Sequence, residues 1–154
     1  MIGREISDPH GLESGGRTIA GLGLMPITTT LAMEKTLERI SARHADSGLI
    51  VQGYEIHHGQ TEGLNLPHAV VRKDGRVIGV QSEDGLLWGT YMHGIFDADE
   101  FRRWFVDRLR TRRAFPPLVK IVAGYDLEPA FDRLADIVRR NLQVDKIYHL
   151  MGLK

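Results

Sequence analysis

The sequence predicts an α/β or α+β domain, with a β-rich first part followed by two helices. Short apolar segments rich in β-branched residues recur through residues 49–92. Two later segments repeat apolar residues at helical spacing, one around Phe101 and one around Phe131. Strands followed by helices are typical of these two classes. The length of 154 residues is that of a single domain.

The N-terminal part is the least regular. Residues 1–6 are typical of the end of a helix that stops before an Asp-Pro pair. Residues 11–21 are rich in glycine and serine and predict a loop. Residues 22–30 favour an extended segment because they contain a proline and several threonines. Residues 32–43 contain helix-forming residues in too short a run to decide.

The middle of the chain is β-like. Its strongest local signal is Asp74-Gly75, which lies between two apolar runs and predicts a hairpin. The last strand of this region leads directly into His93. Strands are predicted at residues 49–51, 54–57, 69–71, 76–80 and 86–92.

Two amphipathic helices follow. The first has apolar residues at positions 101, 104, 105 and 109, and either Asp97 or Asp99 is expected to cap its N-terminus. The second has them at positions 131, 134, 135, 138 and 142, with Asp126 as the expected cap.

Composition excludes several classes of function. Twenty basic and twenty acidic side chains give a net charge of zero, which argues against a nucleic-acid binder and against attachment to an anionic membrane. No apolar run approaches the roughly 18–20 residues of a transmembrane helix. The chain has no cysteine, so it contains no disulfide, thiolate zinc site or cysteine nucleophile. No signal peptide is visible, and we expect a cytoplasmic protein.

His93 is the first candidate catalytic residue. It ends an apolar strand and is followed at once by glycine, at the kind of position where α/β enzymes place catalytic groups. An imidazole can act as a general base near neutral pH. A structural histidine would show the same local pattern, and nothing nearby in the sequence supplies a nucleophile for it to activate.

Glu55 and His57 are the second candidates. They lie two residues apart on a predicted strand, so their side chains share one face. With His93 they could form a metal site of two histidines and one carboxylate. The alternative is that Glu55 pairs with His57 and that His58 is solvated. Because the spacing is not a zinc signature, we expect no metal here.

Arginines crowd the first predicted helix and its end. A phosphate or nucleic-acid patch is one interpretation, and the solvated face of an amphipathic helix is the other. We favour the solvated face, because the opposite face of the helix is apolar and cations suit a helix C-terminus. These arginines are Arg102, Arg103, Arg108, Arg110, Arg112 and Arg113.

Two motifs resemble the C-terminal glutamine amidotransferase domain of the cobyric acid synthase family. They are GYEIHHGQT at residues 53–61 and WGTYMHGIFD at residues 88–97. Flanking segments of that family are similar, in the same order, to residues 1–9, 21–26, 34–37, 125–126 and 131–136, so the resemblance covers nearly the whole chain.

The resemblance implies the flavodoxin-like, three-layer domain of class I glutamine amidotransferases. Residues 1–154 would be the single C-terminal portion of that domain, without its N-terminal strands and nucleophile elbow. Residues 1–9 would be the remnant of the elbow helix. We expect a chain with such an exposed sheet edge and apolar face to associate when it is on its own.

The resemblance also implies a chemistry and its residues. In this family a cysteine attacks the side-chain amide of glutamine and a histidine activates the thiol. His93 matches that histidine, while Tyr54, Glu55 and His57 match a motif expected to shape the substrate site. The wider triad class has a glutamate where this chain has Ile95, so the orienting partner of His93 is not revealed.

The implied partners lie outside this chain. Ammonia would pass to a synthetase domain, in cis or in trans, which uses ATP and Mg²⁺ to amidate corrin carboxylates. We expect no cofactor in the chain itself and no activity from it alone, because it lacks the cysteine. The alternatives are a related amidotransferase acting on another carboxylate, such as a cell-wall precursor, and a non-catalytic docking module.

Overall fold

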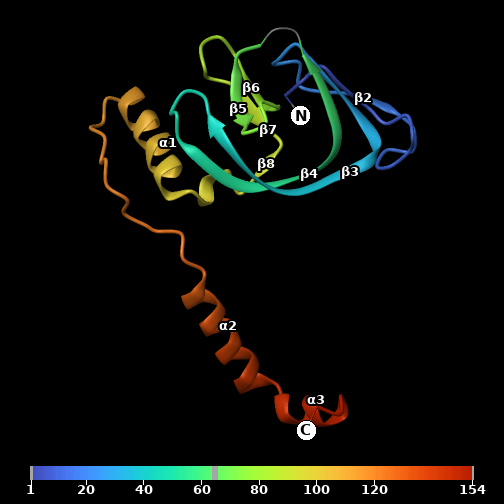
Figure 1. The fold of residues 1–154 in the computed structure, drawn as a ribbon, viewed down its shortest axis with the longest axis vertical. Coiled ribbons are helices and arrows are strands. Elements are labelled where there is room, and N and C mark those ends of the chain that lie inside the picture. The colour runs from blue at the N-terminus through green and yellow to red at the C-terminus, as the bar shows by residue number, and fades with distance from the viewer. Residues whose placement is uncertain (1, 64–65, 154) are drawn as a thin grey trace. The chain divides into compact units, whose positions relative to one another are not determined.

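The computed structural model describes residues 2–63 and 66–153 (Figure 1). The chain forms two units, residues 1–121 and residues 122–154. The described part of the first unit contains an eight-stranded sheet, a short 3-10 helix η1 (Ile95–Asp97) and the helix α1 (Asp99–Arg112). The fold is therefore mixed α/β, as the sequence predicts.

The sheet is almost entirely antiparallel. Its strands follow the order β2-β1-β3-β5-β6-β7, and β4 pairs with β3 and β8. The described pairs are antiparallel except for β1 with β3. The strands are β1 (Glu5–Ser7), β2 (Thr18–Ala20), β3 (Ile27–His44), β4 (Ile50–Gly63), β5 (His68–Arg72), β6 (Val77–Gln81), β7 (Trp88–Thr90) and β8 (Met92–His93).

The three-layer arrangement that the resemblance implies stays a prediction. A three-layer α/β fold needs parallel strands joined by crossover helices. In the first unit, the described residues show antiparallel neighbours, several of them joined by short turns, and α1 is the α-helix that packs against the sheet.

The longest element is the hairpin of β3 and β4, which Figure 1 shows as two strongly curved strands. A register shift between Leu31 and Thr36 interrupts their ladder, and such bulges bend a strand and increase its twist. The undecided residues 32–43 belong to β3. The alternation of buried Ile40, Ala42 and His44 with less buried neighbours explains this, because a period of two suits a strand and not a helix.

The core of the first unit lies between the sheet and α1. Phe101 is completely buried there, and its ring contacts those of Trp88, Trp104 and His44 at centroid distances of 4.8–6.3 Å. The predicted helix thus forms with its apolar side inward. The buried cluster comprises Ile40, Ala42, Val51, Ala69, Val70, Ile78, Met92, Ile95 and Phe101.

The prediction that residues 1–9 are the remnant of the elbow helix is wrong for the described residues of that segment, which contain a strand. Residues 5–7 form β1, whose backbone pairs with β2 on one side and β3 on the other, so tertiary pairing overrides the helical pattern. The Asp8 carboxylate then accepts hydrogen bonds from the main-chain N–H groups of residues 12–14. The bond from Ser14 is the largest cause that holds the pKa of Asp8 well below its usual range, and burial opposes it.

Local predictions in the rest of the unit are mixed. The hairpin at Asp74-Gly75 is confirmed as the β5–β6 turn. The predicted strand at 86–92 is split into β7 and β8 by Tyr91, whose N–H donates to the Ile78 carbonyl. The predicted aspartate cap of α1 is wrong, because Ala98 is the N-cap and makes no side-chain capping bond.

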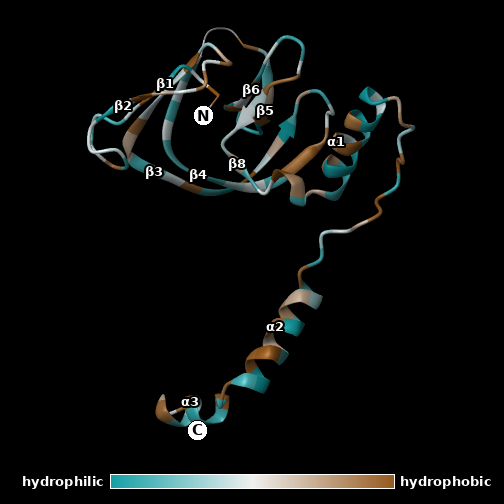
Figure 2. Ribbon diagram, turned by 180° about the vertical axis from the view of Figure 1, so that it is seen from behind, coloured by the Kyte–Doolittle hydropathy of each residue, from teal (hydrophilic) through white to brown (hydrophobic). Residues whose placement is uncertain are grey.

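The second unit contains α2 (Glu128–Asn141) and α3 (Val144–Leu150). The predicted second helix is confirmed as α2. Its N-cap is Leu127 and not the predicted Asp126, although Asp126 accepts a hydrogen bond of 3.1 Å from the N–H of Glu128. Apolar and polar segments alternate along α2 (Figure 2), and Phe131 and Leu134 are more than half exposed. Among the described residues, no helix combines the length and the apolar character needed to cross a bilayer.

We predict that Phe101→Ala destabilises the first unit by about 3–5 kcal/mol, because it removes the largest completely buried side chain and leaves a cavity. Urea unfolding measures this loss. The matched control is Phe115→Ala, whose ring is 59% exposed, and it should cost less than about 1 kcal/mol. Equal losses for the two variants would contradict the position of Phe101 at the centre of the core.

Candidate active-site strand pair

The candidate catalytic histidine lies on the two-residue strand β8 at the edge of β4. His93 is the cross-strand neighbour of Tyr54, and Met92 is that of Glu55. Neighbours across a ladder share a face of the sheet, so the side chains of His93 and Tyr54 lie together. Both are exposed, Tyr54 to 48%, which leaves them open to a ligand.

Two glycines allow this arrangement. A side-chain carbon on Gly53 would lie 2.1 Å from the carbonyl oxygen of His93, so only glycine lets β8 approach β4 so closely. Gly94 has a φ of +76°, a left-handed conformation that turns the chain from β8 into η1. The GY and HG pairs of the two sequence motifs therefore meet across one ladder.

The ring of His93 is held by a main-chain group. Its Nε2 donates to the carbonyl oxygen of Ile56 at 3.3 Å. A carbonyl can only accept, so the proton sits on Nε2 in the neutral ring. Within residues 2–63 and 66–153, Nδ1 makes no such bond and is free to accept a proton. This is the arrangement that a general base requires.

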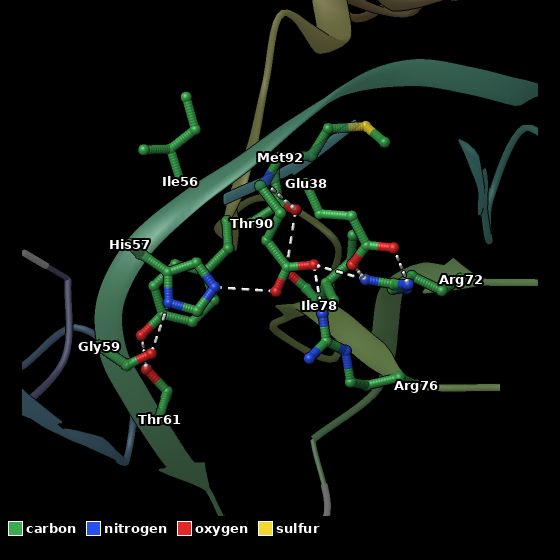
Figure 3. A network of polar contacts seen from close by, with 12 residues as sticks. Glu38, Ile56, His57, Gly59, Thr61, Arg72, Arg76, Ile78, Thr90 and Met92 are labelled. Atoms are coloured by element: carbon green, nitrogen blue, oxygen red, sulfur yellow. Dashed lines mark hydrogen bonds and ion pairs between the residues drawn. The ribbon is translucent and has the colours of Figure 1, made fainter. Parts of the chain in front are cut away.

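Glu55 and His57 lie on the opposite face of β4. Figure 3 shows the side chain of Ile56 pointing away from His57, as the alternation of a strand demands. His57 Nε2 donates to Glu55 Oε1 at 2.8 Å, and His57 Nδ1 donates to the Gly59 carbonyl at 2.6 Å. The predicted pairing of Glu55 with His57 is therefore confirmed. The ring of His57 also stacks on that of Tyr91, with 3.8 Å between the ring centroids.

Two arginines complete the surroundings of Glu55, which is 1% exposed. Its second oxygen, Oε2, accepts a bond of 3.0 Å from Arg72 and a shorter one from Arg76 (Figure 3). Arg72 also forms two bonds, of 2.7 and 3.0 Å, with the carboxylate of Glu38. A carboxylate buried this deeply is tolerated only because cations and hydrogen bonds compensate its charge.

Burial and the ion contacts of Glu55 shift its pKa in opposite directions. Burial raises the pKa of Glu55, but the hydrogen bonds from His57 and Arg72 and the charge of Arg76 outweigh it and hold the pKa below its ordinary value. Glu55 is therefore ionised at neutral pH.

The metal alternative is wrong, because β4 separates its three members. Glu55 and His57 lie on one face, and His93 lies on the face of Tyr54. Among the described residues, no three His, Cys, Asp or Glu side chains come together as a metal site would require. The expectation that His58 is solvated is also wrong, since it is partly buried and its Nδ1 donates to the Ala32 carbonyl at 3.0 Å.

One cavity of the first unit does not include His93 among its lining residues. It has a volume of about 590 Å³ and is lined mainly by apolar residues of β3, β6 and β7. Thr61 and Tyr91, which share a hydrogen bond beside His57, also line it, whereas His93 and Tyr54 do not. The candidate catalytic face and this cavity therefore lie on different sides of β4.

Three arginines of α1 form ion pairs with aspartates of the protein itself. Arg103 contacts Asp107 at 2.7 Å, and Arg108 contacts Asp46 at 2.6 Å. Arg102 pairs in the same way with Asp99. This pairing argues against a free patch that binds phosphate, but the predicted solvated face is not seen for Arg103, whose side chain is 13% exposed.

Sequence reasoning missed Arg72, Arg76 and Tyr91. The two arginines flank the predicted hairpin turn, so they could be placed near each other, but no local pattern shows that this hairpin reaches Glu55 on β4. Tyr91 belongs to the second motif. The sequence predicts it within a continuous strand. In the structure it lies outside the β4–β8 ladder and its ring stacks on that of His57.

Gly53→Ala should separate β8 from β4, because the added carbon meets the main-chain oxygen of His93. We expect a loss of about 1–3 kcal/mol in the free energy of unfolding. The matched control is Gly89→Ala on β7, whose added carbon meets only the tip of the Ile2 side chain, at 3.1 Å. A melting temperature for Gly53→Ala equal to that of the control would refute the close approach.

The lowered pKa of Glu55 predicts a pH dependence of stability. The ionised form is favoured by folding, so its contribution is complete above the ordinary value of 4.5 and is lost as the pH falls through the lower pKa of the folded protein. Free energies of unfolding measured between pH 7 and pH 3 should fall less steeply for Glu55→Gln than for the parent chain. Glu62→Gln removes an exposed acidic side chain from the same strand, and equal slopes for the two variants would rule out the ion pairs of Glu55.

Comparisons with known proteins agree with the two motifs. Residues 1–101 match the family of CobB/CobQ-like glutamine amidotransferase domains. The chain is 42% identical over 154 residues to the adenosylcobalamin biosynthesis bifunctional protein CobDQ of Leptospira interrogans serogroup Icterohaemorrhagiae serovar Lai, covering 99% of this chain and 18% of that protein.

Two cobyric acid synthases are similarly close. That of Nitratidesulfovibrio vulgaris is 41% identical over 185 residues, covering 99% of this chain and 34% of the relative. That of Rhodobacter capsulatus is 41% identical over 150 residues, covering 97% and 30%. The chain thus spans about a third of these synthases or less, and the part that it matches is their C-terminal one. The chain belongs to the family of CobB/CobQ-like glutamine amidotransferase domains.

Proposed function

We propose that this chain supplies the histidine half of the glutaminase centre of a cobyric acid synthase. The observation that supports it most directly is the state of His93, which is exposed beside Tyr54 with its Nε2 proton bonded to the Ile56 carbonyl and its Nδ1 free. The family supports the same reading. Relatives named cobyric acid synthase cover almost the whole chain and favour a corrin carboxylate over a cell-wall precursor as the final acceptor.

The proposed reaction uses His93 as base and then as acid. Nδ1 takes the proton of a cysteine thiol, and the thiolate attacks the side-chain amide carbon of glutamine. The proton then goes from His93 to the leaving nitrogen, which departs as ammonia and leaves a thioester. Water, deprotonated by His93, cleaves the thioester to give glutamate and the thiol. Tyr54, next to His93, is proposed to line the glutamine site.

The cysteine must come from outside these 154 residues, because the chain contains none. We propose that it lies on a strand-to-helix elbow, on the same polypeptide or on a partner, and that elbow and chain together form the three-layer domain. ATP and Mg²⁺ would act in a separate synthetase domain that receives the ammonia. The described residues of this chain contain no cluster of side chains that could hold a metal ion.

The test is complementation of glutaminase activity. Co-expression with an N-terminal segment that carries the cysteine elbow should yield release of glutamate from glutamine, and His93→Ala should lower kcat roughly 10²–10⁴-fold. His10→Ala, at another exposed histidine, is the matched control and should leave kcat unchanged.

A failed complementation has a definite meaning when the elbow segment is shown to be active with the matching C-terminal half of its own synthase. In that case, binding of the two pieces without glutamate release would replace the proposal by the non-catalytic docking module. Activity that survives His93→Ala would also overturn it.

A further inference from the structure

We infer that the main-chain carbonyl of Ile56 is the orienting partner of the His93 imidazole, and that the buried pair Glu55–His57 positions this carbonyl from the other face of β4. The inference rests on the proposed function of His93. It makes Glu55 and His57 positioning residues, which act on the base through the backbone between them and do not touch the substrate.

A base of this kind needs a group that fixes its ring and its tautomer. Ile95, two residues beyond His93, cannot serve, because its side chain is apolar and 5% exposed within the core. The bond from His93 Nε2 to the Ile56 oxygen supplies this function, since a carbonyl accepts only a proton-bearing nitrogen. Nδ1 is thereby kept unprotonated for the thiol.

The Ile56 carbonyl is available because the β4–β8 ladder is short. It comprises two pairs, Tyr54 with His93 and Glu55 with Met92, so Ile56 lies just beyond it. The next residue of the other strand, Tyr91, directs its N–H to Ile78 instead. An oxygen at the open end of this ladder therefore takes its proton from a side chain and not from the opposite strand.

The carbonyl belongs to the peptide group that links Ile56 to His57, and the residues on both sides of Ile56 are held firmly. Glu55 and His57 bond to each other at 2.8 Å, and His57 also bonds to the Gly59 carbonyl at 2.6 Å. The first bond spans this peptide group and the second fixes the ring of His57, so together they limit the rotation of the peptide group. Its oxygen is thus held where His93 Nε2 can donate to it.

The same histidine steadies the strand that carries His93. The ring of His57 stacks on Tyr91, two residues before His93, and the Tyr91 hydroxyl bonds to Thr61 on β4. His57 is therefore linked to both groups of this hydrogen bond. It is linked to the acceptor, the Ile56 carbonyl, through the backbone of β4, and to the donor, His93, through Tyr91.

Arg72 and Arg76 keep Glu55 ionised, which lets it hold His57 with its full charge. Glu38 bonds to Arg72 but forms no hydrogen bond or ion pair with Ile56 or His57 among the described residues. Glu38→Gln is consequently a matched control. It makes the same chemical change as Glu55→Gln on the neighbouring strand and within the same ion cluster.

The direct test is magic-angle-spinning NMR of the full chain, labelled with ¹⁵N in histidine and ¹³C in the isoleucine carbonyl. This measurement does not depend on the state of association. We expect a dipolar coupling between His93 Nε2 and the Ile56 carbonyl carbon, with the proton on Nε2. The coupling should be lost in Glu55→Gln and retained in Glu38→Gln.

His57→Phe is the second variant, and it decides the matter if Glu55→Gln does not fold. It keeps the stacking on Tyr91 and removes both hydrogen bonds of His57, so it should also lose the coupling. Absence of the coupling in the parent chain overturns the inference. The inference is also overturned if the coupling persists in each of the two variants that folds.

The kinetic test uses the complemented glutaminase. Glu55→Gln should lower kcat roughly 10²-fold while KM for glutamine changes little, because the base is misplaced and the substrate site is not. Glu38→Gln should retain kcat, and a rise in KM alone for Glu55→Gln would contradict a positioning role.

The two proposals fail in different ways. If the coupling is present and no glutaminase activity appears, the proposed function fails. If activity that depends on His93 appears without the coupling, the function stands and the assignment of Ile56 falls.

Discussion

The sheet depends on the ion pairs that surround the buried carboxylate of Glu55. An ionised group that is 1% exposed is unfavourable unless several donors surround it. Here the donors come from different segments, His57 from β4, Arg72 from β5 and Arg76 from the residue just before β6. Arg72 adds β3 through Glu38. The charge is therefore satisfied only when β3, β4 and the β5–β6 hairpin meet.

The consequence for function lies in the two faces of β4. Its alternation places the ion cluster on one side and Tyr54, next to His93, on the other. One side therefore holds the buried carboxylate of Glu55 and its ion pairs, while the other leaves Tyr54 and His93 exposed. The peptide group between Ile56 and His57 links the two faces. The bonds of Glu55 and His57 on one face can therefore fix the His93 ring on the other without a direct side-chain contact.

The success of each sequence prediction depended on how local its cause was. The Asp74-Gly75 turn and the helices around Phe101 and Phe131 were predicted correctly because their signals lie within a few residues. Residues 5–7 were expected in a helix and residues 32–43 were not decided, and both form strands through pairing with distant segments. The metal hypothesis put residues of two strands on one face, although the register between those strands cannot be read from the sequence.

By itself, the sequence determined the mixed class, the hairpin, the two helices, the family and the identity of His93, Tyr54, Glu55 and His57 as residues of interest. It did so because turn chemistry, helical periodicity and motif spacing are properties of neighbouring residues. Only the tertiary structure decided which of the four share a face, that Arg72, Arg76 and Tyr91 join them, and that a main-chain carbonyl holds His93. Those outcomes follow from strand register and from the need to neutralise a buried charge, and both are set by residues far apart in the chain.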